Sequence, residues 1–197
     1  KGTKQLGKKP ILINDLKSII NAIDEFNKIE KKKLRDKAIL LVGFSGGFRR
    51  SELVEIEYDD VEFVSEGVKI FIKRSKTDQS GEGMIKAIPY FENKNFCPVV
   101  NLKKWIDYSV IKSGKIFNIS DKSVALIIKK YASLSGLDPN KYGGHSLRSG
   151  FATSTAESGA EERNIMAMTG HKTTQMVRRY IKDANLFKNN ALNKIKI

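Results

Sequence analysis

The sequence predicts an α+β fold that is mainly α-helical and includes a small antiparallel β-sheet of about three strands. Apolar residues recur every three or four positions in the first and last parts of the chain, as on the buried face of a helix. Over residues 61–89 the interval becomes two, as in a strand with one buried face. The chain has 197 residues, of which 40% are hydrophobic, so one domain with a substantial core is expected.

Two long helices are predicted in the amino-terminal part. Asn14 or Asp15 is placed to cap the first, whose apolar positions run from Leu16 to Phe26 at helical spacing. The second should end near Gly46, because glycine closes helices readily. Its apolar face consists of Leu34, Ala38, Leu41 and Val42.

A short helix over residues 49–54 leads into the segment with strand spacing. Residues 84–89 form a second extended run, and residues 61–63 are a candidate for the strand that begins the sheet. In the central run, alternate positions are apolar, namely Val68, Ile70 and Ile72, with Lys69, Phe71 and Lys73 between and after them. This alternation predicts that one face of the sheet packs on the helices.

Helical spacing returns after Pro98, a residue favoured in the first turn of a helix. We predict helices over residues 99–113, 123–133, 145–157 and 161–169. Gly170 should end the last of these, and a further helical segment surrounds Tyr180.

The chain divides into three parts. Residues 1–10, with four lysines, two glycines and a proline, are expected to be a linker to a further amino-terminal domain. Residues 11–183 form the folded domain. Residues 184–197 carry a short amphipathic stripe of Phe187, Ala191 and Ile195.

Charge indicates the class of partner. Lys and Arg number 36 against 22 Asp and Glu, which gives a net charge of +14 and a pI near 9.7. This excess favours a polyanion, with nucleic acid as the expected partner, and the alternative is a lysine-rich solvated surface. The single cysteine, Cys97, excludes an internal disulfide. The longest apolar run falls far short of the roughly 20 residues that a membrane span requires.

Arginine is unevenly distributed. Only eight of the basic residues are arginine, and five lie in three short segments: Arg49, Arg50, Arg148, Arg178 and Arg179. The planar guanidinium can grip two oxygens of one phosphate, which lysine cannot do.

Three groups of residues could carry chemistry. His145 and Arg148, three positions apart, share a helix face and suit an anion, although a capping histidine and a surface arginine would look the same. Glu52 lies one turn after Arg49 and can hold it in position, or the two can form a solvated ion pair. Lys76 stands at the tip of the predicted hairpin, where it can reach a ligand or simply be solvated.

The order of these segments resembles that of the tyrosine recombinases, the phage-integrase family. The pattern is G-x-R-x-S-E-L from Gly47, a lysine in a β-hairpin, H-x-x-R from His145, T-G-H from Thr169, and a tyrosine nine residues after His171. The resemblance extends from about residue 11 to residue 181, with no departure at a catalytic position. It implies the DNA breaking-rejoining catalytic fold of that family.

The resemblance also implies a role for each site residue. Tyr180 would be the nucleophile that forms a 3′-phosphotyrosyl intermediate. Arg49 and Arg148 would clamp the scissile phosphate, with Glu52 orienting Arg49. The acid, base and hydrogen-bonding roles would fall to Lys76 at the leaving 5′-oxygen, His145 at the tyrosine proton and His171 at a phosphate oxygen.

By the same resemblance the partner is double-stranded DNA, and no metal or cofactor is required. The full-length protein is expected to act as a tetramer on two DNA sites in the cytoplasm of a bacterium or a phage-infected host, without a membrane, whereas the isolated domain can be monomeric. The carboxyl-terminal segment is expected to pass to a neighbouring subunit, or else to pack on its own domain. DNA binding by this chain should be weak, mostly non-specific and sensitive to salt.

Three other functions remain open at this point. A metal-dependent nuclease would use Asp59, Asp60 and the triplet from Glu92 to Lys94, although the acidic residues over 55–62 fit a solvated surface more simply. A pure DNA-binding module would have the same basic surface without the chemistry. A type IB topoisomerase would share the chemistry. The sequence does not distinguish integration, excision, resolution and transposition, and it does not reveal the DNA target.

Overall fold

The structure is a computed structural model that describes residues 8–73, 83–171, 173–185 and 195. Its first half contains α1 (Ile13–Phe26), α2 (Glu30–Ser45), α3 (Arg50–Glu55), the 3-10 turn η1 (Tyr58–Asp60), β1 (Val61–Val64), β2 (Gly67–Ile72) and β3 (Met84–Pro89). Its second half contains α4 (Pro98–Ser109), α5 (Asp121–Leu134), η2 (Pro139–Lys141), α6 (Ser146–Glu157), α7 (Glu162–Thr169) and α8 (Thr174–Asn185). The predicted α+β class is confirmed.

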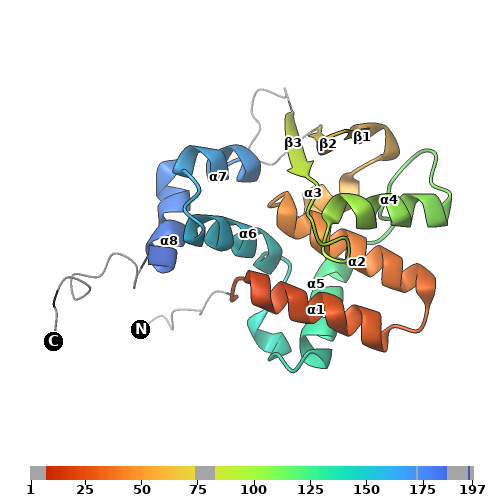
Figure 1. Ribbon diagram of the computed structural model, residues 1–197, viewed down its shortest axis with the longest axis horizontal. Coiled ribbons are helices and arrows are strands. Elements are labelled where there is room, and N and C mark those ends of the chain that lie inside the picture. Colours follow the sequence, from red (N-terminus) through yellow and green to blue (C-terminus); the bar gives the residue numbers. More distant parts are fainter. Residues whose placement is uncertain (1–7, 74–82, 172, 186–194, 196–197) are drawn as a thin grey trace.

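The helices form two groups. α1, α2, α4 and α5 make a bundle on one side of the molecule, and α6 runs from it towards α7 and α8 at the opposite end (Figure 1). α2 packs against α4, α6 and α1, and every residue from Asp36 to Ser45 is buried. α2 is therefore the central helix of the core, and its second half is buried on all sides.

The sheet has three antiparallel strands, as predicted, and their order is β1-β2-β3. Val68, Ile70 and Ile72 face the core, whereas Lys69 and Phe71 are exposed. In the register of β2 and β3, Ile70 lies opposite Lys86 and Val68 opposite Ile88. Lys86 is thereby placed on the buried face of the sheet.

A separate small apolar cluster lies under the carboxyl-terminal helices. Ala152 and Ala156 of α6, Ile165 of α7 and Val177 of α8 are all buried, and Tyr180 packs on their edge. The position of Tyr180 thus depends on how α8 packs against α6 and α7.

Two helix ends differ from the prediction. α1 begins at Ile13 after Leu12, and neither Asn14 nor Asp15 caps it. The Asp15 carboxylate instead accepts a hydrogen bond from Tyr142 Oη at 3.0 Å. α4 ends at Ser109, four residues early, because Val110 turns into the left-handed region with φ of 52°. That turn returns the chain to the core, where Trp105 Nε1 donates to the Ile116 carbonyl at 2.9 Å.

At two positions the backbone requires glycine rather than a larger residue. Gly170 ends α7 as predicted, with φ of +63° in the left-handed conformation that suits glycine. Gly150 of α6 lets the amino-terminal segment pass close to the helix, since a Cβ there would lie 1.9 Å from the Ile11 carbonyl oxygen. None of the helices in the described ranges combines the length and apolar character needed to cross a membrane.

Candidate active site

Arg49 is held by the start of α3. It is the N-cap of that helix, and its backbone N–H donates to Glu52 Oε2 at 2.9 Å. Its Nη1 donates to Glu52 Oε1 at 2.5 Å, and Glu52 is buried while Arg49 is 24% exposed on its side chain. One carboxylate therefore fixes both the backbone and the guanidinium of Arg49, as the spacing of three predicted.

Arg148 is the most deeply buried arginine of the described chain, at 1% exposure. Its Nη1 donates to the Gly47 carbonyl at 2.8 Å, whereas its Nη2 is buried without a hydrogen-bond partner among the described residues. Burial, and next the positive charge of Arg49, lower the pKa of Arg148 to about 10, so the group is still charged at neutral pH. A buried cation with an unsatisfied N–H is suited to an anion.

His145 and Tyr180 meet at the rim of this site. His145 precedes the first residue of α6, and its Nε2 lies 3.5 Å from Tyr180 Oη on α8. Burial, and then the charges of Arg148 and Arg49, lower the pKa of His145. The ring is therefore neutral at pH 7 and able to accept a proton from the phenol.

His171 follows the left-handed turn at Gly170, and its ring centre lies 6.0 Å from that of Tyr180. Its Nδ1 is 2.7 Å from Thr169 Oγ1, and the Thr169 hydroxyl donates to the Ile165 carbonyl at 2.6 Å. A hydroxyl has one proton, so Thr169 must accept from Nδ1–H. Burial, followed by the charges of Arg148 and Arg49, lowers the pKa of His171 to about 4. The neutral ring then presents Nε2 as an acceptor.

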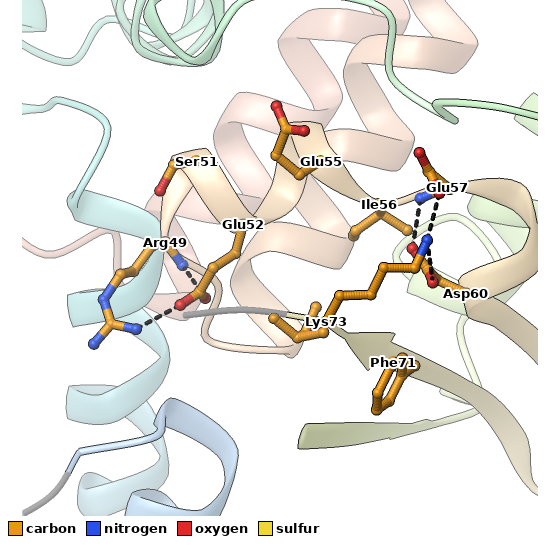
Figure 2. Close-up of a pocket in the computed structure, with 10 residues that line it drawn as sticks. Arg49, Ser51, Glu52, Glu55, Ile56, Glu57, Asp60, Phe71 and Lys73 are labelled. Atoms are coloured by element: carbon orange, nitrogen blue, oxygen red, sulfur yellow. Dashed lines mark hydrogen bonds and ion pairs between the residues drawn. The ribbon is translucent and has the colours of Figure 1, made fainter. Parts of the chain in front are cut away.

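Two hollows flank Arg49. One, of about 450 Å³, extends from Arg49 to Lys73, and Figure 2 shows Lys73 directed at Glu57 and Asp60 at the far end. The other, of about 580 Å³, is lined by the basic side chains of Lys8, Arg50 and Lys129, together with the neutral His145 and Asp121, which pairs with Arg50. Arg49 thus stands between a hollow whose charged side chains are mainly carboxylates and a predominantly basic hollow.

The structure brings six of the seven predicted site residues together: Arg49, Glu52, His145, Arg148, His171 and Tyr180. Lys76 lies outside the described residues. Lys73, the preceding lysine, is paired with Glu57 and Asp60.

Sequence analysis named Thr169 only as part of the T-G-H pattern, without a role, and it missed Lys86. Thr169 sets the tautomer of His171, as described above. Lys86 is fully buried, with Nζ 2.7 Å from the Gly46 carbonyl and 2.5 Å from that of Met168. The available signal was the strand alternation, because a buried Ile88 implies that Lys86 also faces inward.

Of the carboxylates that a metal-dependent nuclease would use, Asp60 is engaged in other contacts, and Asp59 and Glu92 are exposed. Asp60 is buried, accepts the Glu57 N–H at 3.0 Å and pairs with Lys73. In the described part of the chain, His, Cys, Asp and Glu side chains form no group of three that could hold a metal ion. The structure offers this alternative no ligand set there.

The fold and the site together define a class of domain: mainly helical, with two arginines, two histidines and a tyrosine gathered beside a basic hollow. The model of the phage integrase family matches residues 11–186, and the chain belongs to this family.

Individual proteins agree with this assignment. The chain is 49% identical to an integrase/recombinase xerD homolog of Selenomonas ruminantium, over 99% of this chain and 60% of that protein. It is 31% identical to a tyrosine recombinase of Agathobacter rectalis, over 78% of this chain and 49% of that one. The chain thus spans about half to three fifths of these relatives.

Solved structures share the fold. A crystal structure of the XerH site-specific recombinase, bound to a palindromic difH substrate after cleavage, matches 93% of this chain and 54% of its own with a TM-score of 0.73 and 16% identity. A crystal structure of the XerA recombinase matches 100% of this chain and 68% of its own, with a TM-score of 0.72 and 19% identity.

Proposed function

We propose that this chain is the catalytic part of a site-specific DNA recombinase that cuts and rejoins strands through a covalent bond to Tyr180. The observation that carries the proposal is the placement of Tyr180 Oη 3.5 Å from His145 Nε2, beside the buried guanidinium of Arg148, whose Nη2 has no hydrogen-bond partner within the described ranges. A nucleophile, a base and an anion site thus occupy one place.

In the proposed step, Tyr180 Oη attacks the phosphorus of a DNA phosphodiester. The new bond joins the tyrosine to the 3′-phosphate, and the bond to the 5′-oxygen breaks. His145 Nε2 takes the phenol proton, and Lys76 gives a proton to the departing 5′-oxygen. Attack by a second 5′-hydroxyl reverses the sequence, so strands are rejoined without water or a nucleotide cofactor.

Arg49 and Arg148 are proposed to stabilise the charge of the transition state. Arg49 is oriented by Glu52 and Arg148 by the Gly47 carbonyl, so both guanidiniums are positioned before the phosphate arrives. The proposed hydrogen bond from His171 to a phosphate oxygen requires protonation at Nε2, since Nδ1–H is used by Thr169. A bound phosphate favours that protonation because it offsets the nearby arginine charges.

Double-stranded DNA is the proposed substrate. The basic hollow beside Arg49 and the net charge of +14 support phosphate contacts on this face. A homo-oligomer on two DNA sites is proposed for the full-length protein.

We also propose that the segment after α8 binds a neighbouring subunit. Two residues of its apolar stripe, Phe187 and Ala191, lie outside the described residues. The third, Ile195, is described and is 58% exposed. An apolar hollow of about 470 Å³ offers an acceptor surface. It is lined by, among others, Ile13, Phe44, Phe91, Phe96, Phe151 and Met168. Deleting residues 186–197 should impair assembly and cleavage on a two-site substrate, and unchanged assembly would contradict the exchange.

The deciding experiment is carried out in EDTA with nicked DNA. The nick lets the short fragment that carries the new 5′-hydroxyl diffuse away after cleavage, so that rejoining cannot occur. Wild type should form an SDS-resistant adduct that maps to Tyr180, and Tyr180→Phe should form none while still binding DNA. Tyr108→Phe is the matched control, since Tyr108 is 52% exposed on α4. Binding without an adduct would favour a DNA-binding module. Cleavage that EDTA abolishes would favour a metal-dependent nuclease.

A further inference from the structure

Lys86 is a buried cationic side chain that the proposed chemistry does not use. It lies on β3 opposite Ile70 and is 0% exposed. Among the described residues, only Arg148 and Lys86 are basic side chains with less than 2% exposure. No ion pair of Lys86 is found with a described carboxylate, so its partners are backbone carbonyls and the ring of Phe48, whose centre is 4.5 Å from Nζ.

The two carbonyls belong to the two segments that deliver active-site groups. Gly46 begins the run Gly46-Gly47-Phe48-Arg49, in which the Gly47 carbonyl also accepts from Arg148. Met168 begins the run Met168-Thr169-Gly170-His171, in which Thr169 holds Nδ1 of His171. One amine therefore joins a segment 40 positions before it to a segment 82 positions after it.

The bridge can form in both protonation states of Lys86, although the charged amine makes the stronger hydrogen bonds. Burial lowers its pKa to about 7; Glu52 opposes this shift, and Arg148 and Arg49 reinforce it. The neutral amine still has two N–H groups, one for each carbonyl, so the bridge persists in either state. An apolar side chain of similar length would leave the buried Gly46 carbonyl and the partly buried Met168 carbonyl without this donor.

We propose that Lys86 is a positioning residue, whose Nζ sets the separation of the Arg49 segment from the His171 segment. This inference rests on the proposed function and deepens it. Arg49 and His171 address the same phosphate in that proposal, and a small displacement of either changes the rate of reaction at a bound phosphate more than it changes DNA affinity.

The test replaces Lys86 with methionine, which keeps the length of the side chain and removes the donors. Lys69→Met is the matched control, because Lys69 is an exposed lysine on the adjacent strand. Adduct formation is measured at saturating nicked DNA, together with DNA affinity and the melting temperature. Lys86→Met should lower the adduct rate by about tenfold or more while affinity changes by less than about threefold. Lys86→Arg, which restores N–H donors, should recover part of the rate.

A second readout separates this proposal from the proposed function. The ring resonances of His171, observed by NMR without DNA, should shift in Lys86→Met and stay unchanged in Lys69→Met. This shift is expected even if wild type forms no adduct, in which case only the proposed function fails. A folded Lys86→Met protein with wild-type rate and wild-type His171 resonances overturns the positioning role. If Lys86→Met does not fold, Lys86→Gln is judged by the same criteria. Unfolding of both variants overturns the proposal in favour of a purely structural lysine.

Discussion

His145 Nε2 lies 3.5 Å from the phenolic oxygen of Tyr180, although 35 positions separate the two residues. The contact joins the start of α6 to the middle of α8, across the small apolar cluster that these helices share with α7. The proposed acceptor of the tyrosine proton is therefore in place before DNA binds.

His145→Gln should slow adduct formation at saturating DNA by about 10²- to 10⁴-fold, the range over which a positioned base contributes. DNA affinity should stay close to that of wild type, because the glutamine can still donate a hydrogen bond. Single-turnover kinetics on the nicked substrate measure the effect, with the melting temperature as a check on folding. An unchanged rate would remove His145 from the reaction.

His171 should titrate in two different ranges with and without an anion. Burial and the arginine charges lower its pKa to about 4, so the free protein should hold it neutral well below the ordinary value of 6.5. Inorganic phosphate should raise this pKa, because its negative charge offsets Arg148 and Arg49. NMR titration measures the pKa of His171 with and without phosphate, and the variant His171→Gln identifies which of the two histidine signals belongs to His171. An ordinary pKa in the free protein, or no response to phosphate, would contradict the arrangement.

Glu52→Gln should weaken the support of Arg49. The backbone N–H and the guanidinium of Arg49 donate to different oxygens of Glu52, and glutamine replaces one of these acceptors with an NH2 donor. We expect a loss of about 1–3 kcal/mol in the free energy of unfolding and a slower adduct rate. Denaturant unfolding and the adduct assay check this. The control is Glu55→Gln, on the same helix, whose exposed pair with Lys115 should contribute little. Equal effects of the two variants would count against a supporting role for Glu52.

Gly150→Ala should destabilise the protein even though it lies inside α6. Alanine in a helix is favoured over glycine by about 1 kcal/mol, yet its Cβ would stand 1.9 Å from the Ile11 carbonyl oxygen. Forced displacement of packed backbone typically costs about 1–3 kcal/mol, so the net effect should be a lower free energy of unfolding. Gly143→Ala is the control, since its Cβ would meet only the flexible Lys8 side chain. A Gly150→Ala protein as stable as wild type would show that the segment at Ile11 can move away.

The sheet shows how far sequence patterns carry. The alternation of Val68, Ile70 and Ile72 predicted which residues face the core, because successive side chains of a strand point to opposite faces. The same rule places Lys86 on the inward face. A lysine is ordinarily expected to be exposed, however, so this placement is convincing only when the pairing of Lys86 with Ile70 is known. The end of α4 was missed because Val110, a non-glycine residue, adopts the left-handed conformation there, and the helical spacing of the apolar residues does not reveal such a turn.

By itself, the sequence determined the periodic elements, the large positive net charge and the set of residue types from Arg49 to Tyr180. These follow from local spacing and side-chain chemistry, which a single sequence displays directly. Only the tertiary structure decided that Arg148 is buried with an N–H that no described residue accepts, that Thr169 fixes the tautomer of His171, and that Lys86 joins the segments of Arg49 and His171. Hydrogen bonds act over about 3 Å, so such relationships exist only once packing has brought distant segments together.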